Sequence, residues 1–146
     1  MTKAMTKFEP VGKASNSTKR PGFVTRQSED LVANQLLRPL FDDQHETLIF
    51  AGFDAFERLV RLHRIDGDTN GRCVIVPRCW RVLLDDSITS VIMAHNHPSG
   101  SAWPSEADIG TTQKATLFLR TLGIELVDHL IFVVGGHFSF RTAEML

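Results

Sequence analysis

The segment from His95 to Asp108 gathers side chains that could hold a catalytic metal ion. It reads HNHPSGSAWPSEAD. Imidazole nitrogens and carboxylate oxygens are ligands that Zn²⁺ accepts, and a catalytic zinc site typically uses three protein ligands and keeps a fourth position for water. His95, His97 and Asp108 supply that number, so the segment predicts a zinc site suited to hydrolysis.

The two histidines are spaced for a β-strand. The run before them, residues 90–94, is apolar and of strand length. Because side chains at positions i and i+2 of a strand share a face, His95 and His97 would point at one ion from the strand end, while Asn96 would face the other way in a structural role.

The carboxylate is spaced for the start of a helix. After a turn at Pro98 to Gly100, Ser105 can cap a helix that carries Asp108 in its first turn, facing back toward the histidines. An H-x-H pair can also occur on a surface by chance, and Ser-x-x-Asp is an ordinary capping motif, so a site without metal is the alternative.

The whole pattern, His-x-His, seven residues, Ser, two residues, Asp, resembles the signature of the JAMM (MPN/JAB) metalloproteases. The longer strings HNHPSG and PSEADI are similar to the bacterial RadC-like branch of that family, whose name is linked to DNA repair. The resemblance covers roughly residues 28–146. It implies an α/β fold of the MPN/JAB, cytidine-deaminase-like type, with a mixed β-sheet flanked by helices.

The resemblance also implies roles for single residues. His95, His97 and Asp108 would bind Zn²⁺, and Ser105 would help to bind the developing oxyanion. JAMM enzymes use a glutamate on an early strand as general base, and Glu46, at the start of the strand-like run 46–53, fits that role best. Glu57 is the second choice, and an exposed carboxylate without a catalytic role is the alternative for Glu46.

The implied reaction is hydrolysis of a peptide or isopeptide bond in a peptide or protein substrate. Zinc lowers the pKa of bound water to about 7, so that the general base can remove a proton and later pass it to the leaving amine. A rival from another class is a non-catalytic module that binds protein or DNA, with a role in DNA repair. The helix-hairpin-helix region of RadC-like proteins is not evident in the N-terminal tail of this sequence, which weakens that rival.

The other four histidines are not expected to bind the metal. The resemblance places Asp128 and His129 behind the metal ligands or in a structural role, since imidazoles that bind metal usually have supporting partners. His45 could replace a ligand only if the strand register differed. His63 and His137 are expected to be exposed.

Composition and charge indicate how many domains the chain forms and which partners it would have. With 146 residues, 42% of them hydrophobic, the chain suits one globular domain. Sixteen Lys and Arg against 17 Asp and Glu give a net charge of −1; nucleic acid is therefore not indicated by charge, and no membrane segment or oligomeric state is predicted. Cys73 and Cys79 match no zinc spacing and suggest free thiols in a cytoplasmic protein.

The chain is expected to divide into a disordered tail, residues 1–25, and one folded domain, residues 26–146. The turn-rich run 66–71 is expected to be a plain turn without calcium. The predicted elements of the domain are a helix over 28–38, a hairpin of strands 46–53 and 58–65, a helix over 77–84, a strand over 90–94, a helix over 105–122, and strands over 124–134 and 137–141.

Overall fold

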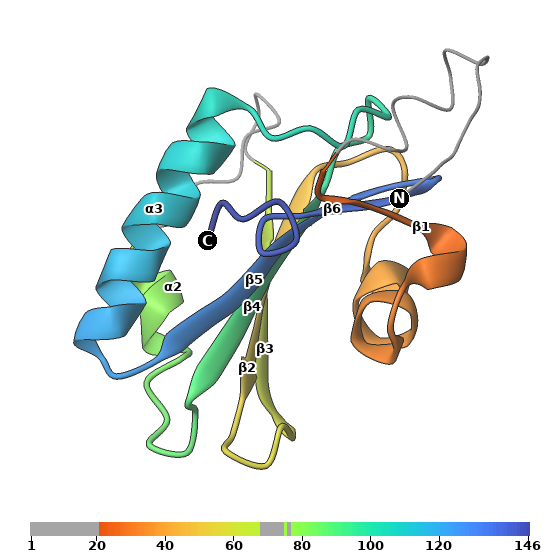
Figure 1. The fold of residues 1–146 in the computed structure, drawn as a ribbon. Coiled ribbons are helices and arrows are strands. Elements are labelled where there is room, and N and C mark those ends of the chain that lie inside the picture. Colours follow the sequence, from red (N-terminus) through yellow and green to blue (C-terminus); the bar gives the residue numbers. More distant parts are fainter. Residues whose placement is uncertain (1–20, 68–74, 76) are drawn as a thin grey trace, which may run out of the picture.

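A computed structural model describes residues 21–67, 75 and 77–146. In this part of the chain, six strands form one mixed sheet with the order β1-β6-β5-β4-β2-β3 (Figure 1). The strands are β1 (Phe23–Thr25), β2 (Thr47–Phe53), β3 (Leu59–Asp66), β4 (Ser90–Asn96), β5 (Glu125–Val133) and β6 (Gly136–Ser139). Strands β4 and β5 are parallel and the other pairs are antiparallel. This confirms the predicted α/β fold.

Helices lie on both faces of the sheet. The helices α2 (Pro77–Arg81) and α3 (Glu106–Thr121) lie on one face, and a short helical segment, η2 (Val32–Leu37) followed by η3 (Arg38–Leu40), lies on the other (Figure 1). Strand β2 runs between these layers, and all seven of its residues are buried. A strand buried on both faces is an unbroken apolar run rather than an alternating one, which explains the sequence TLIFAGF.

Two apolar cores lie on the two faces of the central strands, and a third, smaller cluster around β5 and β6 contains Ala102, Ile131, Phe138 and Phe140. The core under α2 and α3 includes Phe50, Leu83, Met93 and Leu119. The core under η2 includes Leu37, Ile49 and Phe132. Since both cores pack against β2 and its neighbours, the central strands that carry the candidate site are held from both sides.

The helix predicted over residues 28–38 is confirmed in part: the chain is helical from Leu31 to Leu40, but it starts later than predicted and is not a regular α-helix. Glu29 is extended, with φ −67° and ψ 138°, and a 3₁₀ turn, η1 (Arg26–Ser28), precedes it. The chain then forms the π-helical η2 and the 3₁₀-helical η3 instead of a regular α-helix. Two features explain the difference: the side chain of Glu29 is held by Arg38 and His137, and Pro39 has no N–H for a continuing helix.

Ordered structure begins before the expected boundary at residue 26. Strand β1 pairs with β6, with Val24 opposite His137 and Thr25 opposite Gly136. The close approach depends on Gly136, whose φ is +155° and whose added Cβ would lie 2.1 Å from the carbonyl oxygen of Val24. Residues 1–20 of the tail predicted as disordered lie outside the described residues, as do Cys73 and most of the turn predicted at 66–71.

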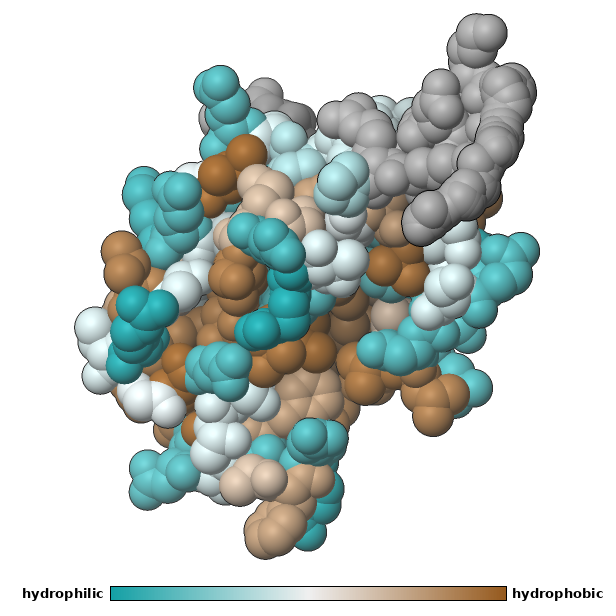
Figure 2. All heavy atoms as spheres, in the orientation of Figure 1, coloured by the Kyte–Doolittle hydropathy of each residue, from teal (hydrophilic) through white to brown (hydrophobic). Residues whose placement is uncertain are grey.

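The hairpin β2–β3, strand β4, helix α3 and strands β5 and β6 match the predicted elements to within a few residues. Cys79 is a buried free thiol. Figure 2 shows polar and apolar side chains interspersed over one face of the molecule. Among the described residues, no helix combines the length and hydropathy that crossing a membrane requires.

Candidate metal centre

The candidate site lies at the C-terminal end of β4. His95 is on this strand and His97 follows it, and the backbone N–H of His97 donates to the carbonyl of Phe132 on β5 at 3.0 Å, so the strand geometry continues one residue further. The two side chains therefore share a face, as predicted, and their Nε2 atoms lie 3.0 Å apart.

Helix α3 brings the carboxylate of Asp108 to both imidazoles. Its Oδ1 lies 3.4 Å from Nε2 of His95 and its Oδ2 lies 3.3 Å from Nε2 of His97. Ser105 caps the helix: its Oγ accepts from the N–H of Asp108 at 3.0 Å, and Oδ2 of Asp108 accepts from the N–H of Ser105 at 2.9 Å. The capping box and the cluster with the histidines therefore occur together, and the cap fixes the direction of the carboxylate.

Glu46 reaches the same cluster from the start of another strand. It directly precedes β2, which pairs with β4 so that Leu48 lies opposite His95. Ligand atoms of Glu46, His95 and His97 all lie within 4.8 Å of one another. Two carboxylates, those of Glu46 and Asp108, thus approach one pair of imidazoles from different elements.

Asn96 holds the segment that carries Glu46. Its Oδ1 accepts from the N–H of Thr47, and its Nδ2 donates to the carbonyls of Asp42 and His45, each at 2.8 Å. This agrees with the structural role expected for a side chain that points away from the two histidines. These bonds set the approach of β2 to β4 at the site.

Two residues considered as alternatives lie elsewhere. Glu57 is exposed in the turn between β2 and β3, with φ +62°, at the other end of β2 from Glu46. His45 is exposed and its Nδ1 lies 3.3 Å from the carboxylate of Asp42. Neither belongs to the cluster of Glu46, His95 and His97.

Asp128 and His129 occupy different positions behind the site. His129 is 1% exposed, and its Nε2 lies 2.8 Å from Nδ1 of His95. Asp128 accepts from the hydroxyl of Ser139 and from the backbone N–H groups of His129 and Arg141. His129 therefore contacts a candidate ligand, whereas Asp128 ties β5 to the end of β6.

The expectation that His137 is exposed is wrong. His137 is 5% exposed, and its Nδ1 lies 2.7 Å from the carboxylate of Glu29. The ring faces inward because strand β6 lies between β1 and β5, which the local sequence does not indicate. His63 is half-buried on β3.

The charges in the cluster favour an ionised carboxylate. Burial raises the pKa of Asp108, but hydrogen bonds with His95 and His97 outweigh burial and hold that pKa well below its usual range. Burial lowers the pKa of His97, but its bonds to Asp108 and to the carbonyl of Ser101 outweigh burial and raise it. Burial holds the pKa of His129 well below its usual value.

Hydrogen-bond directions indicate that the site is suited to a cation. Nδ1 of His97 lies 2.8 Å from the carbonyl oxygen of Ser101, which can only accept, so Nδ1 carries the proton and a neutral ring has its lone pair on Nε2. That lone pair faces the oxygens of Asp108. Acceptor atoms that converge in this way are joined by a proton or by a metal cation, and two imidazoles with a carboxylate match the ligand preferences of Zn²⁺.

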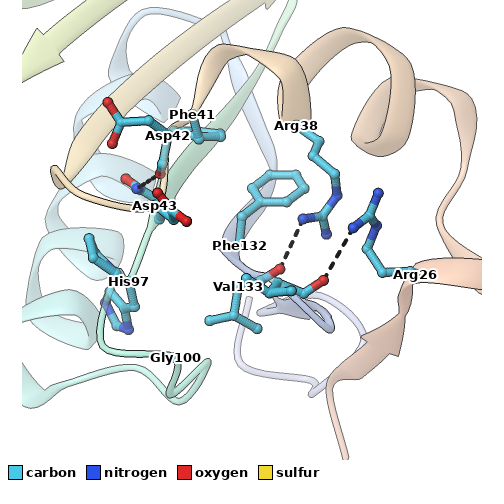
Figure 3. A pocket seen from close by; sticks show the side chains of 12 residues that line it. Arg26, Arg38, Phe41, Asp42, Asp43, His97, Gly100, Phe132 and Val133 are labelled. Carbon is cyan, nitrogen blue, oxygen red and sulfur yellow. Dashed lines mark hydrogen bonds between the residues drawn. The ribbon is translucent and has the colours of Figure 1, made fainter.

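A surface cavity of 390 Å³ adjoins the site (Figure 3). His97 and Gly100 line one side, Phe132 and Val133 line the middle, and Arg26 and Arg38 lie beyond them. His97 is the residue of the cluster that lines this cavity.

Thr112 is a site residue that the sequence interpretation missed. Its hydroxyl lies 2.6 Å from Nδ1 of His129 and 2.7 Å from the carbonyl oxygen of Asp108. The available signal was the spacing of Asp108 and Thr112 on the predicted helix, because residues four apart lie on the same helix face.

Comparison with known proteins identifies one family over most of the chain. Residues 26–145 match the family model described as the RadC-like JAB domain. A UPF0758 protein of Streptococcus agalactiae is 34% identical over 115 residues, which are 78% of this chain and 51% of that protein. A UPF0758 protein of Actinobacillus pleuropneumoniae is 31% identical over 106 residues, 72% of this chain and 48% of that protein. The chain thus spans about half the length of these relatives.

Proposed function

The chain belongs to the RadC-like JAB domain family, and from this premise we propose that it is a zinc-dependent hydrolase of the JAMM type that cleaves a peptide or isopeptide bond. The observation that carries the proposal is the meeting of His95, His97 and Asp108 at contact distance, with Glu46 beside them. These four side chains come from the β2 end, the β4 end and α3, so the fold itself assembles the set.

The two carboxylates, those of Asp108 and Glu46, would have different roles. Asp108 contacts both Nε2 atoms and is fixed by the cap of α3, which suits a metal ligand. Glu46 approaches the same imidazoles from β2 and suits a general base. When bound, zinc would polarise the scissile carbonyl and lower the pKa of water.

Glu46 would transfer protons, and Ser105 would stabilise the negative charge of the oxyanion. Glu46 would accept a proton from the attacking water and deliver it to the leaving amine nitrogen. The hydroxyl of Ser105 accepts from the N–H of Asp108, which leaves its own proton free for donation to an oxyanion. The cavity beside His97 would receive the substrate segment on one side of the scissile bond.

Two glutamate variants test the proposal against a matched control. Glu46→Gln should lower the hydrolysis of fluorogenic peptide and isopeptide pools by the zinc-loaded protein by about 100-fold or more, as expected for loss of a general base. Glu57→Gln is the control, because Glu57 lies at the far end of β2, and it should match the wild type. Hydrolysis that is unchanged in Glu46→Gln would refute the role of Glu46.

The same assay separates the rival function. If the wild type binds zinc but hydrolyses none of the pool and instead binds a protein or DNA probe, the catalytic proposal fails and a non-catalytic binding module is supported. A DNA probe with a salt titration would show whether phosphate contacts carry that binding.

A further inference from the structure

A buried chain of hydrogen bonds runs behind the candidate metal ligands. It starts at the carbonyl oxygen of Asp108, passes at 2.7 Å to Oγ1 of Thr112, at 2.6 Å to Nδ1 of His129, and from Nε2 of His129 at 2.8 Å to Nδ1 of His95. Thr112 and His129 are 2% and 1% exposed. These hydrogen bonds therefore link two candidate ligands that lie on different elements, His95 on β4 and Asp108 on α3.

The direction of the first two bonds follows from the available hydrogens. A carbonyl oxygen cannot donate, so the contact between Thr112 and Asp108 uses the single proton of the Thr112 hydroxyl. That hydroxyl oxygen can then only accept from His129, which places a proton on Nδ1 of His129.

The direction of the third bond follows in turn. Burial disfavours a charged ring at His129, and a neutral imidazole that carries its proton on Nδ1 has a lone pair on Nε2. Nε2 must therefore accept, and His95 must donate from Nδ1. A neutral His95 then has its lone pair on Nε2, the atom that faces Asp108 at 3.4 Å.

We propose that Thr112 and His129 are positioning residues that fix the tautomer of His95, so that its Nε2 lone pair points into the metal site. The inference rests on the proposed zinc function and extends it to two residues that touch neither metal nor substrate. Phe140 supports the arrangement, because its ring stacks on that of His129 with centroids 4.7 Å apart and planes 7° apart.

Because each of these hydrogen bonds sets the direction of the next, the tautomer of His95 depends on the hydroxyl of Thr112. If the hydroxyl is lost, Nδ1 of His129 has no acceptor, and the proton is better placed on Nε2, where it can donate to Nδ1 of His95. His95 would then hold its own proton on Nε2 and could no longer bind metal through that atom. Thr112 is thus expected to affect zinc binding through two intervening hydrogen bonds.

Three variants of helix α3 test this inference. Thr112→Val removes the hydroxyl and keeps the shape, Thr112→Ser restores the hydroxyl, and Thr116→Val is the matched control. Thr116 lies one turn further along and donates to the carbonyl of Thr112 at 2.8 Å rather than to a histidine. The readouts are the tautomers of His129 and His95 from nitrogen chemical shifts of histidine-labelled protein, and the dissociation constant of zinc.

The wild type should carry the His129 proton on Nδ1. Thr112→Val should move it to Nε2 and weaken zinc binding by about 10- to 100-fold, the usual effect of losing a partner of a metal ligand. Thr112→Ser and Thr116→Val should keep the wild-type tautomer and affinity. A wild-type His129 proton on Nε2, or a Thr112→Val protein with unchanged tautomers and zinc affinity, would overturn the inference.

The two readouts keep this inference separate from the proposed function. If the wild type binds no zinc, the proposed function fails, and the tautomers in the metal-free protein still decide whether the hydrogen bonds have the inferred direction. If zinc binds as expected but the tautomer does not respond to Thr112, the positioning role fails and the zinc site stands.

Discussion

Replacing Glu29 with glutamine should destabilise the protein at neutral pH much more than it does at acidic pH. The side chain of Glu29 is fully buried, and its carboxylate accepts from Arg38, from Nδ1 of His137 at 2.7 Å and from Asn34 at 3.2 Å. Arg38 in turn donates to the carbonyls of Val133 and Gly136, at 2.9 and 3.0 Å. The cluster therefore ties the segment before β2 to the β5–β6 hairpin.

The size and sign of the effect follow from the pKa of Glu29. Burial raises this pKa, but the hydrogen bonds from Arg38, His137 and Asn34 outweigh burial and lower it from 4.5 to about 2. At about 1.4 kcal/mol per unit, that shift corresponds to about 3 kcal/mol of folding free energy. Because the pKa is lower in the folded protein, this contribution is complete above pH 4.5 and is lost as the pH falls toward 2.

Urea denaturation at a series of pH values measures the effect. Glu29→Gln should lose about 3 kcal/mol at neutral pH, and the difference from the wild type should shrink toward pH 2. Glu125→Gln is the control, because Glu125 is 67% exposed and pairs with Arg141 at 3.2 Å, so its loss should cost less than about 1 kcal/mol. A difference for Glu29→Gln that does not change with pH, or one no larger than that of the control, would refute the reasoning.

Substitutions at three other positions give distinct expected results. Ser105→Ala should lower the free energy of unfolding by about 1 kcal/mol through loss of the cap, and should lower kcat by about 100- to 1,000-fold. Ser105→Asp should restore stability in thermal melts without restoring kcat. A restored kcat would limit the role of Ser105 to capping. Asn96→Ala removes the three hydrogen bonds that hold the segment carrying Glu46, so it should lower the free energy of unfolding in urea by about 2–3 kcal/mol. It should also reduce hydrolysis while zinc stays bound. Unchanged hydrolysis would show that these bonds do not position Glu46. Gly136→Ala should cost more than about 2 kcal/mol and expose β1 to hydrogen exchange, because its Cβ would lie 2.1 Å from the carbonyl oxygen of Val24; protected β1 amides would contradict this.

The arrangement of the site could be predicted because its parts are local in sequence. His95 and His97 follow an apolar strand, and Asp108 lies in the first turn of a capped helix, so period-2 and helix-start rules place them correctly. The position of Glu46 could not be predicted in the same way, because it depends on the pairing of β2 with β4. The order of the elements in the sequence, a hairpin and then a strand, is compatible with that pairing but does not determine it.

The contacts that the sequence did not predict join distant parts of the chain. Thr112 meets His129 and Glu29 meets His137 across 17 and 108 residues, and no local periodicity reports such contacts. The helix expected over 28–38 starts later and has π and 3₁₀ geometry for the same reason, because Glu29 is held extended by its bonds to Arg38 and His137.

Bound metal, measured by elemental analysis of the wild type, His97→Ala and Glu46→Gln side by side, tests the central claim most directly. We predict about one zinc per chain in the wild type and in Glu46→Gln, and loss of zinc in His97→Ala, because His97 contacts Asp108 and His95 and is a proposed ligand, whereas Glu46 is the proposed base. Absence of zinc from the wild type after loading, or zinc that stays bound in His97→Ala, would contradict the account.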